Sequence, residues 1–255
     1  VRDGCGLRFS NRLNCRAETG SETLVEELAE LGPDDRVGIV SLMDHTPGQR
    51  QFTDISKFEA YVCGKYAMDA EGFGEYVQFL HGLHDQFGKA HEEATVAAAK
   101  RFGAVLASHD DTTADQVATS AAYGIHLAEF PTTIAAAQAN HAHGIANIMG
   151  GPNLVRGGSH SGNVAAMELA QNGLLDIISS DYVPSSLLLG AVMLGNEWGN
   201  MAKGLHTVTA APAKYTNLED RGRLQVGLQA DLIRFRLTED VPALRAVWHK
   251  GVRAA

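Results

Sequence analysis

Residues 145–163, IANIMGGPNLVRGGSHSGN, join an apolar run to a glycine-rich loop. The run Ile145–Met149 predicts a buried strand, and a helical pattern resumes near Val164. Between them, Gly150–Asn163 carries five glycines together with Arg156, two asparagines, an imidazole and two hydroxyls. Glycines let backbone N–H groups converge on an anion because they lack a Cβ, and the N-terminus of the following helix adds the positive end of its dipole. An ordinary glycine-rich turn needs none of these side chains, so the stretch predicts a phosphate-binding loop.

Strand-like and helix-like patterns alternate along the chain on both sides of this loop. Apolar runs predict strands over residues 8–18, 37–45, 104–111, 125–130, 145–150 and 174–182. Helical patterns cover residues 22–31, 56–102, 114–122, 134–143 and 164–171. Strands that alternate with helices form a parallel sheet, so the sequence predicts an α/β fold.

The last part of the chain has a different pattern. Short apolar stretches broken by Gly222, Gly227 and Gly251 predict short strands that form a small β-rich appendage. We therefore expect a barrel-forming domain over residues 1–210 and a β-rich segment over residues 211–255.

Polar side chains recur where the predicted strands end. They are Glu18, Asp44, His45, His109, Asp110, Asp111, Glu129 and Asp181. In a parallel α/β barrel the carboxyl ends of the strands form the face that holds the active site. A single polar residue at a strand end is common in solvated loops, but a series on successive strands favours a site.

Imidazole and carboxylate ligands suit zinc or a similar divalent ion. The residues proposed as ligands of one or two such ions are Glu18, His45, His109, Glu129 and Asp181. Each histidine taken alone is more often a hydrogen-bonded, partly buried side chain, and only the grouping favours a metal. For His45 the sequence leaves metal ligation and phosphate contact both open. We assign the remaining histidines to surfaces and local hydrogen bonds: His81, His84, His91, His126, His141, His143, His206 and His249.

Several residues are candidates for contact with an anionic substrate. Arginine can bind phosphate through two parallel hydrogen bonds, and lysine through a point charge. Surface cations paired with nearby acids are the alternative, which weighs about equally for Lys65. The candidates are Arg50, Lys65, Asn153, Arg156, Gly157, Gly158, Ser159, His160 and Ser161.

Composition limits the classes of partner and compartment. The 255 residues are 45% hydrophobic and 20% charged, which is enough for a substantial core. A net charge of −9 argues against nucleic acid, since non-specific binding requires many basic residues. No apolar run approaches the ~20 residues of a membrane span, and the start lacks the apolar core of a signal peptide. We expect a cytoplasmic protein, and a homo-oligomer is left open.

The three cysteines, Cys5, Cys15 and Cys63, have no C-x-x-C spacing. Their positions favour neither a disulfide framework nor a thiolate zinc site. We expect them to be reduced and structural.

Five motifs resemble the phosphonate-metabolism branch of the amidohydrolase superfamily. They are SLMDHTPGQRQF, LASHDDTT, AEFPTT, MGGPNLVRGGSHSGNVAA and LLDIISSDYVPSSLL, and the closing DRGRL pattern with its following ADL resembles the superfamily's tail. The resemblance covers nearly the whole chain, more loosely over residues 56–102. It implies a distorted (β/α)8 barrel with a small β-sandwich. The implied activity is metal-dependent hydrolysis of α-D-ribose 1-methylphosphonate 5-triphosphate to the 5-phosphate and pyrophosphate, within the carbon–phosphorus lyase pathway.

The resemblance also implies roles for single residues. Glu18 resembles the bridging carboxylate of strand three, and His109 resembles the ligand of strand five. Asp181 resembles the strand-eight aspartate that orients or deprotonates the metal-bound water. Glu129 stands where sugar-phosphate deacetylases carry a strand-six histidine. Separately from the resemblance, the strand-end ligands and the glycine-rich loop lead to the hypothesis that Arg156, His160 and the loop amides stabilise charge on the leaving pyrophosphate.

Counting back from Asp181 as strand eight makes the predicted strands three to eight. Strands one and two, with their metal motif and the N-terminal half of the β-sandwich, have no counterpart, so we expect a fragment of a longer protein. Two alternatives stay open. One is an amide or amidine hydrolase such as a deacetylase or deaminase of the same superfamily. The other is an inactive fragment or a scaffold subunit.

Overall fold

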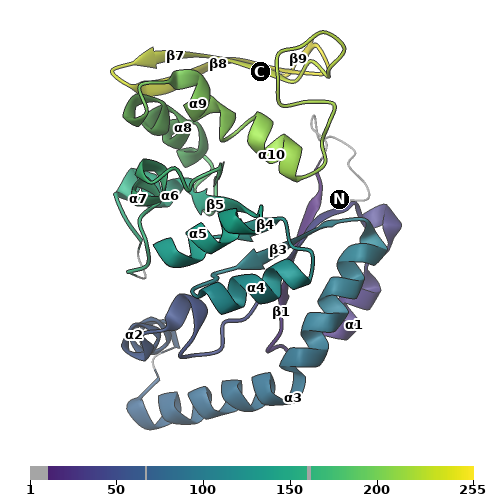
Figure 1. The fold of residues 1–255 in the computed structure, drawn as a ribbon, viewed down its shortest axis with the longest axis vertical. Helices are drawn as coiled ribbons and strands as arrows, with labels where there is room; N and C mark the ends of the chain where they lie inside the picture. The colour runs from purple at the N-terminus through teal and green to yellow at the C-terminus, as the bar shows by residue number, and fades with distance from the viewer. Residues whose placement is uncertain (1–10, 67, 160–161) are drawn as a thin grey trace. The chain divides into compact units, whose positions relative to one another are not determined.

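The computed structural model describes residues 11–66, 68–159 and 162–255 (Figure 1). The chain divides into two compact units. The first, here called the N-terminal unit, comprises residues 12–145. The second, the C-terminal unit, comprises residues 146–255 together with residues 1–11, of which Asn11 is described.

The N-terminal unit contains four parallel strands. They are β1 (Leu13–Glu18), β2 (Val37–Met43), β3 (Val105–His109) and β4 (Leu127–Glu129), and they lie in the sheet in their order along the chain. The register pairs Glu18 with Met43, and His109 with Glu129. The carboxyl ends therefore align at one edge, and the polar residues that follow them are brought to that edge.

Helices connect these strands in the way the sequence predicts. They are α1 (Leu24–Glu30), α2 (Ile55–Tyr66), α3 (Ala70–Phe102), α4 (Ala114–Ala122) and α5 (Ile134–Ala142), with short 3₁₀ turns η1 (Pro33–Asp35) and η2 (Arg50–Phe52). The pattern over residues 56–102 thus resolves into two helices. Among the described residues, no helix is both long enough and apolar enough to cross a membrane.

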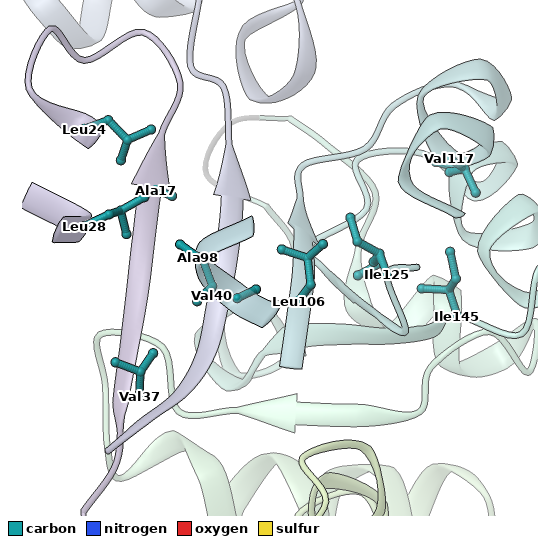
Figure 2. Packing of buried hydrophobic residues seen from close by; sticks show 13 residues of the cluster. Ala17, Leu24, Leu28, Val37, Val40, Ala98, Leu106, Val117, Ile125 and Ile145 are labelled. Carbon is teal, nitrogen blue, oxygen red and sulfur yellow. The ribbon is translucent and has the colours of Figure 1, made fainter. Parts of the chain in front are cut away.

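The core of this unit lies between the sheet and its helices. Figure 2 shows Leu24 and Leu28 of α1 directed towards Ala17 of β1, with Val40 and Leu106 following on β2 and β3. The smaller side chains of α3 allow that helix to pack closely, since Ala98 and Ala99 belong to the same cluster. Burial of these apolar side chains is the main stabilising contribution in this unit.

The opposite face of β1 is polar. Successive side chains of a strand point to opposite faces, so Asn14, Arg16 and Glu18 lie on the face away from the core. Asn14 Nδ2 donates to Glu129 Oε1 of β4 at 3.4 Å. In a flat sheet β1 and β4 would lie ~14 Å apart, because neighbouring strands are ~4.8 Å apart. The contact therefore requires the sheet to curve, as the wall of a barrel does.

The C-terminal unit combines a strand pair, helices and a second sheet. The parallel strands β5 (Ala146–Gly150) and β6 (Ile177–Ser179) are neighbours. Antiparallel β7 (Leu232–Thr238), β8 (Val241–His249) and β9 (Val252–Arg253) form the sheet of the predicted β-rich tail. The helices are α6 (Gly151–Arg156), α7 (Ala166–Gln171), α8 (Ser186–Glu197), α9 (Met201–His206) and α10 (Ala210–Tyr215).

The predicted α/β architecture with parallel strands is confirmed, but the glycine-rich loop is wrong in part. Residues 151–156 form α6 directly after β5. Pro152 lies in the first turn, where it has no hydrogen bond to lose, and Gly157 ends the helix with φ 83°. A short helix that begins at Gly151 and ends before Gly157 thus replaces part of the predicted loop.

Candidate metal centre

Three potential ligands meet at the carboxyl edge of the N-terminal unit. One ligand atom each from His45, His109 and Asp110 lies within 4.8 Å of the others. His45 follows β2, His109 ends β3, and Asp110 comes directly after it. The aligned ends of neighbouring parallel strands bring these residues together.

Glu18 at the end of β1 orients His45. His45 Nδ1 lies 2.5 Å from Glu18 Oε2, and the His45 backbone N–H donates to Glu18 Oε1 at 3.0 Å. The other ring nitrogen, Nε2, lies 3.7 Å from Asp110 Oδ2. Glu18 therefore occupies one nitrogen and leaves the second directed into the cluster.

Glu129 at the end of β4 orients the imidazole ring of His109. His109 Nδ1 lies 3.0 Å from Glu129 Oε2, and Nε2 lies 3.3 Å from Asp110 Oδ2. The rings of His45 and His109 meet edge to face with centroids 5.6 Å apart. An ionised carboxylate accepts a hydrogen bond from Nδ1–H, which leaves the Nε2 lone pair available to a cation.

Asp110 supplies the third atom through an unusual backbone conformation. Its φ is 54°, in the left-handed region that is uncommon for residues other than glycine. The Asp110 backbone N–H donates to Glu129 O at 2.9 Å, which helps to hold this turn. Asp110 is 4% exposed, and its Oδ2 has no hydrogen-bond partner among the described residues.

This buried oxygen tests whether the cluster fits a metal. A buried carboxylate oxygen that accepts no hydrogen bond is costly unless positive charge lies beside it, whether a protonated imidazole or a bound metal ion. Two imidazole nitrogens and this oxygen form a donor set that zinc and similar divalent ions accept. The residues present therefore fit a divalent metal ion.

Glu18 and His45 shift each other's pKa within the cluster. Burial raises the pKa of Glu18, but the hydrogen bond and the positive charge of His45 outweigh it, so that the pKa lies below its usual value. Burial lowers the pKa of His45, but the carboxylates of Asp110 and Glu18 outweigh it and raise the pKa to about 9. The site thus strongly favours positive charge beside these carboxylates.

Arg50, expected to contact substrate, is engaged within the protein. Its Nη1 donates to Asp111 Oδ1 at 2.7 Å and to His109 O at 2.8 Å. Asp111 is fully buried, so this ion pair neutralises a charge that water cannot reach. Lys65, near the end of α2, is exposed with its Nζ 5.1 Å from the centre of the Tyr66 ring. Substrate roles for both residues stay predictions.

Two histidines of α3 contact residues that directly follow the strand ends. His91 is 5% exposed and its Nδ1 lies 3.0 Å from Thr19 O, just after β1. His84 Nδ1 lies 3.3 Å from Asp44 Oδ2, just after β2. The assignment of His91 to the surface is therefore wrong. Its helical periodicity carried no signal of the distant strand that it contacts.

Asp181 lies in the C-terminal unit, just after β6. Its φ is 50°, so the chain turns sharply there. A Cβ at Gly150 would lie only 2.9 Å from Asp181 Oδ2, so the absence of a side chain lets this carboxylate approach β5. Arg156, the last residue of α6, donates from Nη2 to Tyr182 Oη at 3.1 Å. The ends of α6 and β6 therefore lie side by side.

The predicted amide donors of the glycine-rich segment are already used. The N–H groups of Gly157 and Gly158 donate to Asn153 O at 3.1 and 2.9 Å, which caps α6. Asn153 Oδ1 accepts from the backbone N–H of Ala166 at 2.8 Å and so joins α6 to α7. Ser159 directly follows this cap, while His160 and Ser161 lie outside the described residues. Anion binding by this segment stays a prediction.

The sequence pattern places Asp110 at a strand end but does not identify it as a ligand. In an extended strand, consecutive side chains face opposite sides, so His109 and Asp110 should point apart. The left-handed turn at Asp110 brings both to the same cluster. Only the histidine-aspartate pair directly after an apolar run could have suggested this arrangement.

Residues 82–254 match the amidohydrolase family, and the chain belongs to this family. Over 249 residues the chain is 41% identical to the alpha-D-ribose 1-methylphosphonate 5-triphosphate diphosphatase of Escherichia coli (strain K12). The match covers 96% of this chain and 66% of that protein, so the chain spans just under two thirds of its relative's length. The resemblance drawn from the motif series is confirmed.

The solved structures that match this chain have much lower sequence identity to it. L-hydantoinase from Arthrobacter aurescens is 14% identical with a TM-score of 0.43, over 95% of this chain and 64% of that one. 5-Methylcytosine deaminase from Klebsiella pneumoniae is 13% identical with a TM-score of 0.46, over 93% of this chain and 80% of that one.

Proposed function

We propose that this chain carries the active site of a metal-dependent hydrolase that releases pyrophosphate from α-D-ribose 1-methylphosphonate 5-triphosphate. The substrate assignment rests on the 41% identity, over 96% of this chain, to the Escherichia coli diphosphatase named for that compound. The His45, His109 and Asp110 cluster supports the metal requirement.

The metal is proposed to be zinc, as one or two ions. His45, His109 and Asp110 would hold it, while Glu18 and Glu129 fix the two imidazole rings through Nδ1. Glu18 and Glu129 are also candidates for direct metal ligation. For Glu18 the reason is its resemblance to a bridging carboxylate. When bound, a divalent ion lowers the pKa of water towards ~7, so that hydroxide is available at neutral pH.

The remaining steps are assigned to residues of the C-terminal unit. Asp181 would accept a proton from the attacking water, whose oxygen forms a bond to phosphorus. The phosphoanhydride bond then breaks, and pyrophosphate leaves with the bridging oxygen. Arg156 and His160 would stabilise the charge that grows on this leaving group. Because the Gly157 and Gly158 amides cap α6, the side chains carry this role.

The fold supports a matching assignment of the strands. We propose that β1 to β6 correspond to strands three to eight of a (β/α)8 barrel. The residue contact that curves the sheet from β1 to β4 supports a barrel wall. The sheet β7–β9 would belong to a small β-sandwich, within the proposed segment 211–255.

The test is pyrophosphate release from the triphosphate by the zinc-loaded chain, before and after Asp181→Asn. Asp240→Asn, an exposed residue of the same unit, is the matched control. We expect the control to equal wild type, and Asp181→Asn to lower kcat by about 100-fold or more, the scale on which general bases act. Equal rates for all three proteins would exclude the role of Asp181.

The same assay distinguishes the rival chemistry. An amide or amidine hydrolase would turn over an N-acetylated sugar or adenine and release no pyrophosphate from the triphosphate. That pattern would refute the proposed substrate while leaving the metal cluster intact.

A further inference from the structure

Arg16 lies at the metal cluster, yet the proposed mechanism does not use it. It is an exposed residue of β1 on the polar face that also carries Glu18. Arg16 Nη2 lies 3.5 Å from His109 Nε2. This is the ring nitrogen that His109 directs towards Asp110 and offers to a cation.

A guanidinium and a metal ion cannot share this nitrogen. Glu129 holds Nδ1–H of His109, so Nε2 has one lone pair to give. A divalent ion that binds Nε2 takes this lone pair and so displaces the hydrogen bond from the guanidinium. Arg16 would then remain beside the cluster with its donors released.

The charges around the cluster indicate what the released guanidinium would bind. The carboxylates of Glu18, Asp110 and Glu129 are all directed at the two imidazoles. Arg50, the other arginine at this edge, is already paired with buried Asp111. Arg16 is exposed and contacts an imidazole instead of a carboxylate, so its charge is available for an anion that reaches the metal.

We infer that Arg16 exchanges partners, donating to His109 Nε2 when the cluster is empty and to a phosphate oxygen of the substrate when a divalent ion is bound. The inference rests on the proposed function and adds a specificity-determining residue to it. A guanidinium suits this role because its planar donors match the oxygens of a phosphate group.

The exchange predicts opposite effects of one substitution on two ligands. We compare Arg16→Gln with Arg12→Gln, which changes an exposed arginine four residues earlier whose side chain lies over Gly38. Titration calorimetry measures zinc binding to the metal-free chain, and pyrophosphate binding to the zinc-loaded chain. Arg16→Gln should bind zinc at least as tightly as wild type, because the competing cation is gone. It should bind pyrophosphate about 10- to 100-fold more weakly, as expected for the loss of a charge-assisted hydrogen bond.

The outcomes separate the inference from a structural role. Arg12→Gln should match wild type for both ligands, and Arg16→Lys should recover part of the pyrophosphate affinity. If Arg16→Gln weakens zinc and pyrophosphate binding together, Arg16 supports the structure and the inference is wrong. It is also overturned if wild type binds no pyrophosphate or if Arg16→Gln binds it as wild type does.

The proposed function is judged separately, by hydrolysis of the triphosphate. Pyrophosphate binding that depends on Arg16 without any hydrolysis would refute the proposed function and leave the inference standing. If the chain hydrolyses the triphosphate and Arg16→Gln leaves KM unchanged, the proposed function stands and the inference about Arg16 is wrong.

Discussion

Asp110 determines which side chains meet beyond β3. Its positive φ turns the carboxylate to the side on which His109 lies, and its own hydrogen bond to Glu129 O stabilises that turn. A buried oxygen without a partner in such a conformation is costly in the metal-free chain. Functional residues are often held in strained conformations of this kind, and a bound cation would offset the cost.

Asp110→Asn is expected to weaken zinc binding by more than the about 10- to 100-fold typical of residues that act through a ligand. The amide keeps the shape of the side chain and its tolerance for positive φ, but loses the negative charge that would bind a metal ion. Equilibrium dialysis against zinc measures the loss. Asp115→Asn on the exposed first turn of α4 is the control and should bind as wild type does.

Glu129→Gln tests the orienting role of the second carboxylate. Glutamine can still contact His109 Nδ1 but carries no charge to strengthen the basicity of the ring. Zinc affinity should fall about 10- to 100-fold, with the fold retained by circular dichroism. Glu30→Gln, an exposed change on α1, provides the baseline. A zinc affinity within about twofold of that of Glu30→Gln would show that Glu129 has no role in zinc binding, because such a change is no larger than about RT in free energy.

At the scale of elements, apolar runs and helical periodicity predicted most helices and strands. The runs before His45, His109 and Glu129 are strands, and α4 has the bounds that the pattern gave. The signal failed at α6, because a six-residue helix is too short to show a period and its glycines resembled a loop. The contact of His91 with Thr19 was equally hidden, since it joins residues 72 positions apart.

The N-cap of α4 offers an element-scale test of stability. Thr113 Oγ1 accepts from the Gln116 N–H at 3.2 Å, and Gln116 Oε1 accepts in return from the Thr113 N–H at 3.1 Å. Thr113→Ala removes the first of these bonds and should lower the free energy of unfolding by about 1 kcal/mol. Urea denaturation measures the change. Thr119→Ala on the exposed side of the same helix should change it by less than half as much, so equal losses would argue against capping.

The C-terminal sheet should depend on pH through Asp231. Burial raises the pKa of Asp231, but hydrogen bonds from the Lys250 N–H and Gln229 and the charge of His249 lower it more, so the net shift is downward. A lowered pKa in the folded state stabilises it above the unfolded value of about 3.9, and this contribution is lost as pH falls through the folded pKa.

Asp231→Asn should therefore be less stable than wild type near about pH 7, by at most about 1 kcal/mol for a partly exposed group. The difference should shrink as pH falls below the unfolded pKa of about 3.9, and should vanish only below the lowered folded pKa, where the wild-type carboxyl is also neutral. Urea midpoints across this range measure it. A constant difference at every pH would show that charge is not the cause.

At the scale of the molecule, the order of the strands made the site partly predictable. Parallel strands have their carboxyl ends at one edge, so the sequence pattern alone groups Glu18, His45, His109 and Glu129. Which of these residues direct an atom into the cluster could not be predicted, because that depends on ring orientation and on a single backbone turn. In the structure, Glu18 and Glu129 orient the imidazole rings, whereas His45, His109 and Asp110 direct atoms into the cluster.

The central claim is that this cluster binds a divalent metal, and X-ray absorption at the zinc edge of the zinc-loaded chain tests it most directly. We predict one tightly bound zinc or more, with nitrogen and oxygen neighbours at ~2.0–2.2 Å and scattering from at least two imidazole rings. Asp110→Asn should lose this signal. Sulfur neighbours at ~2.3 Å, or zinc without imidazole scattering, would contradict the account.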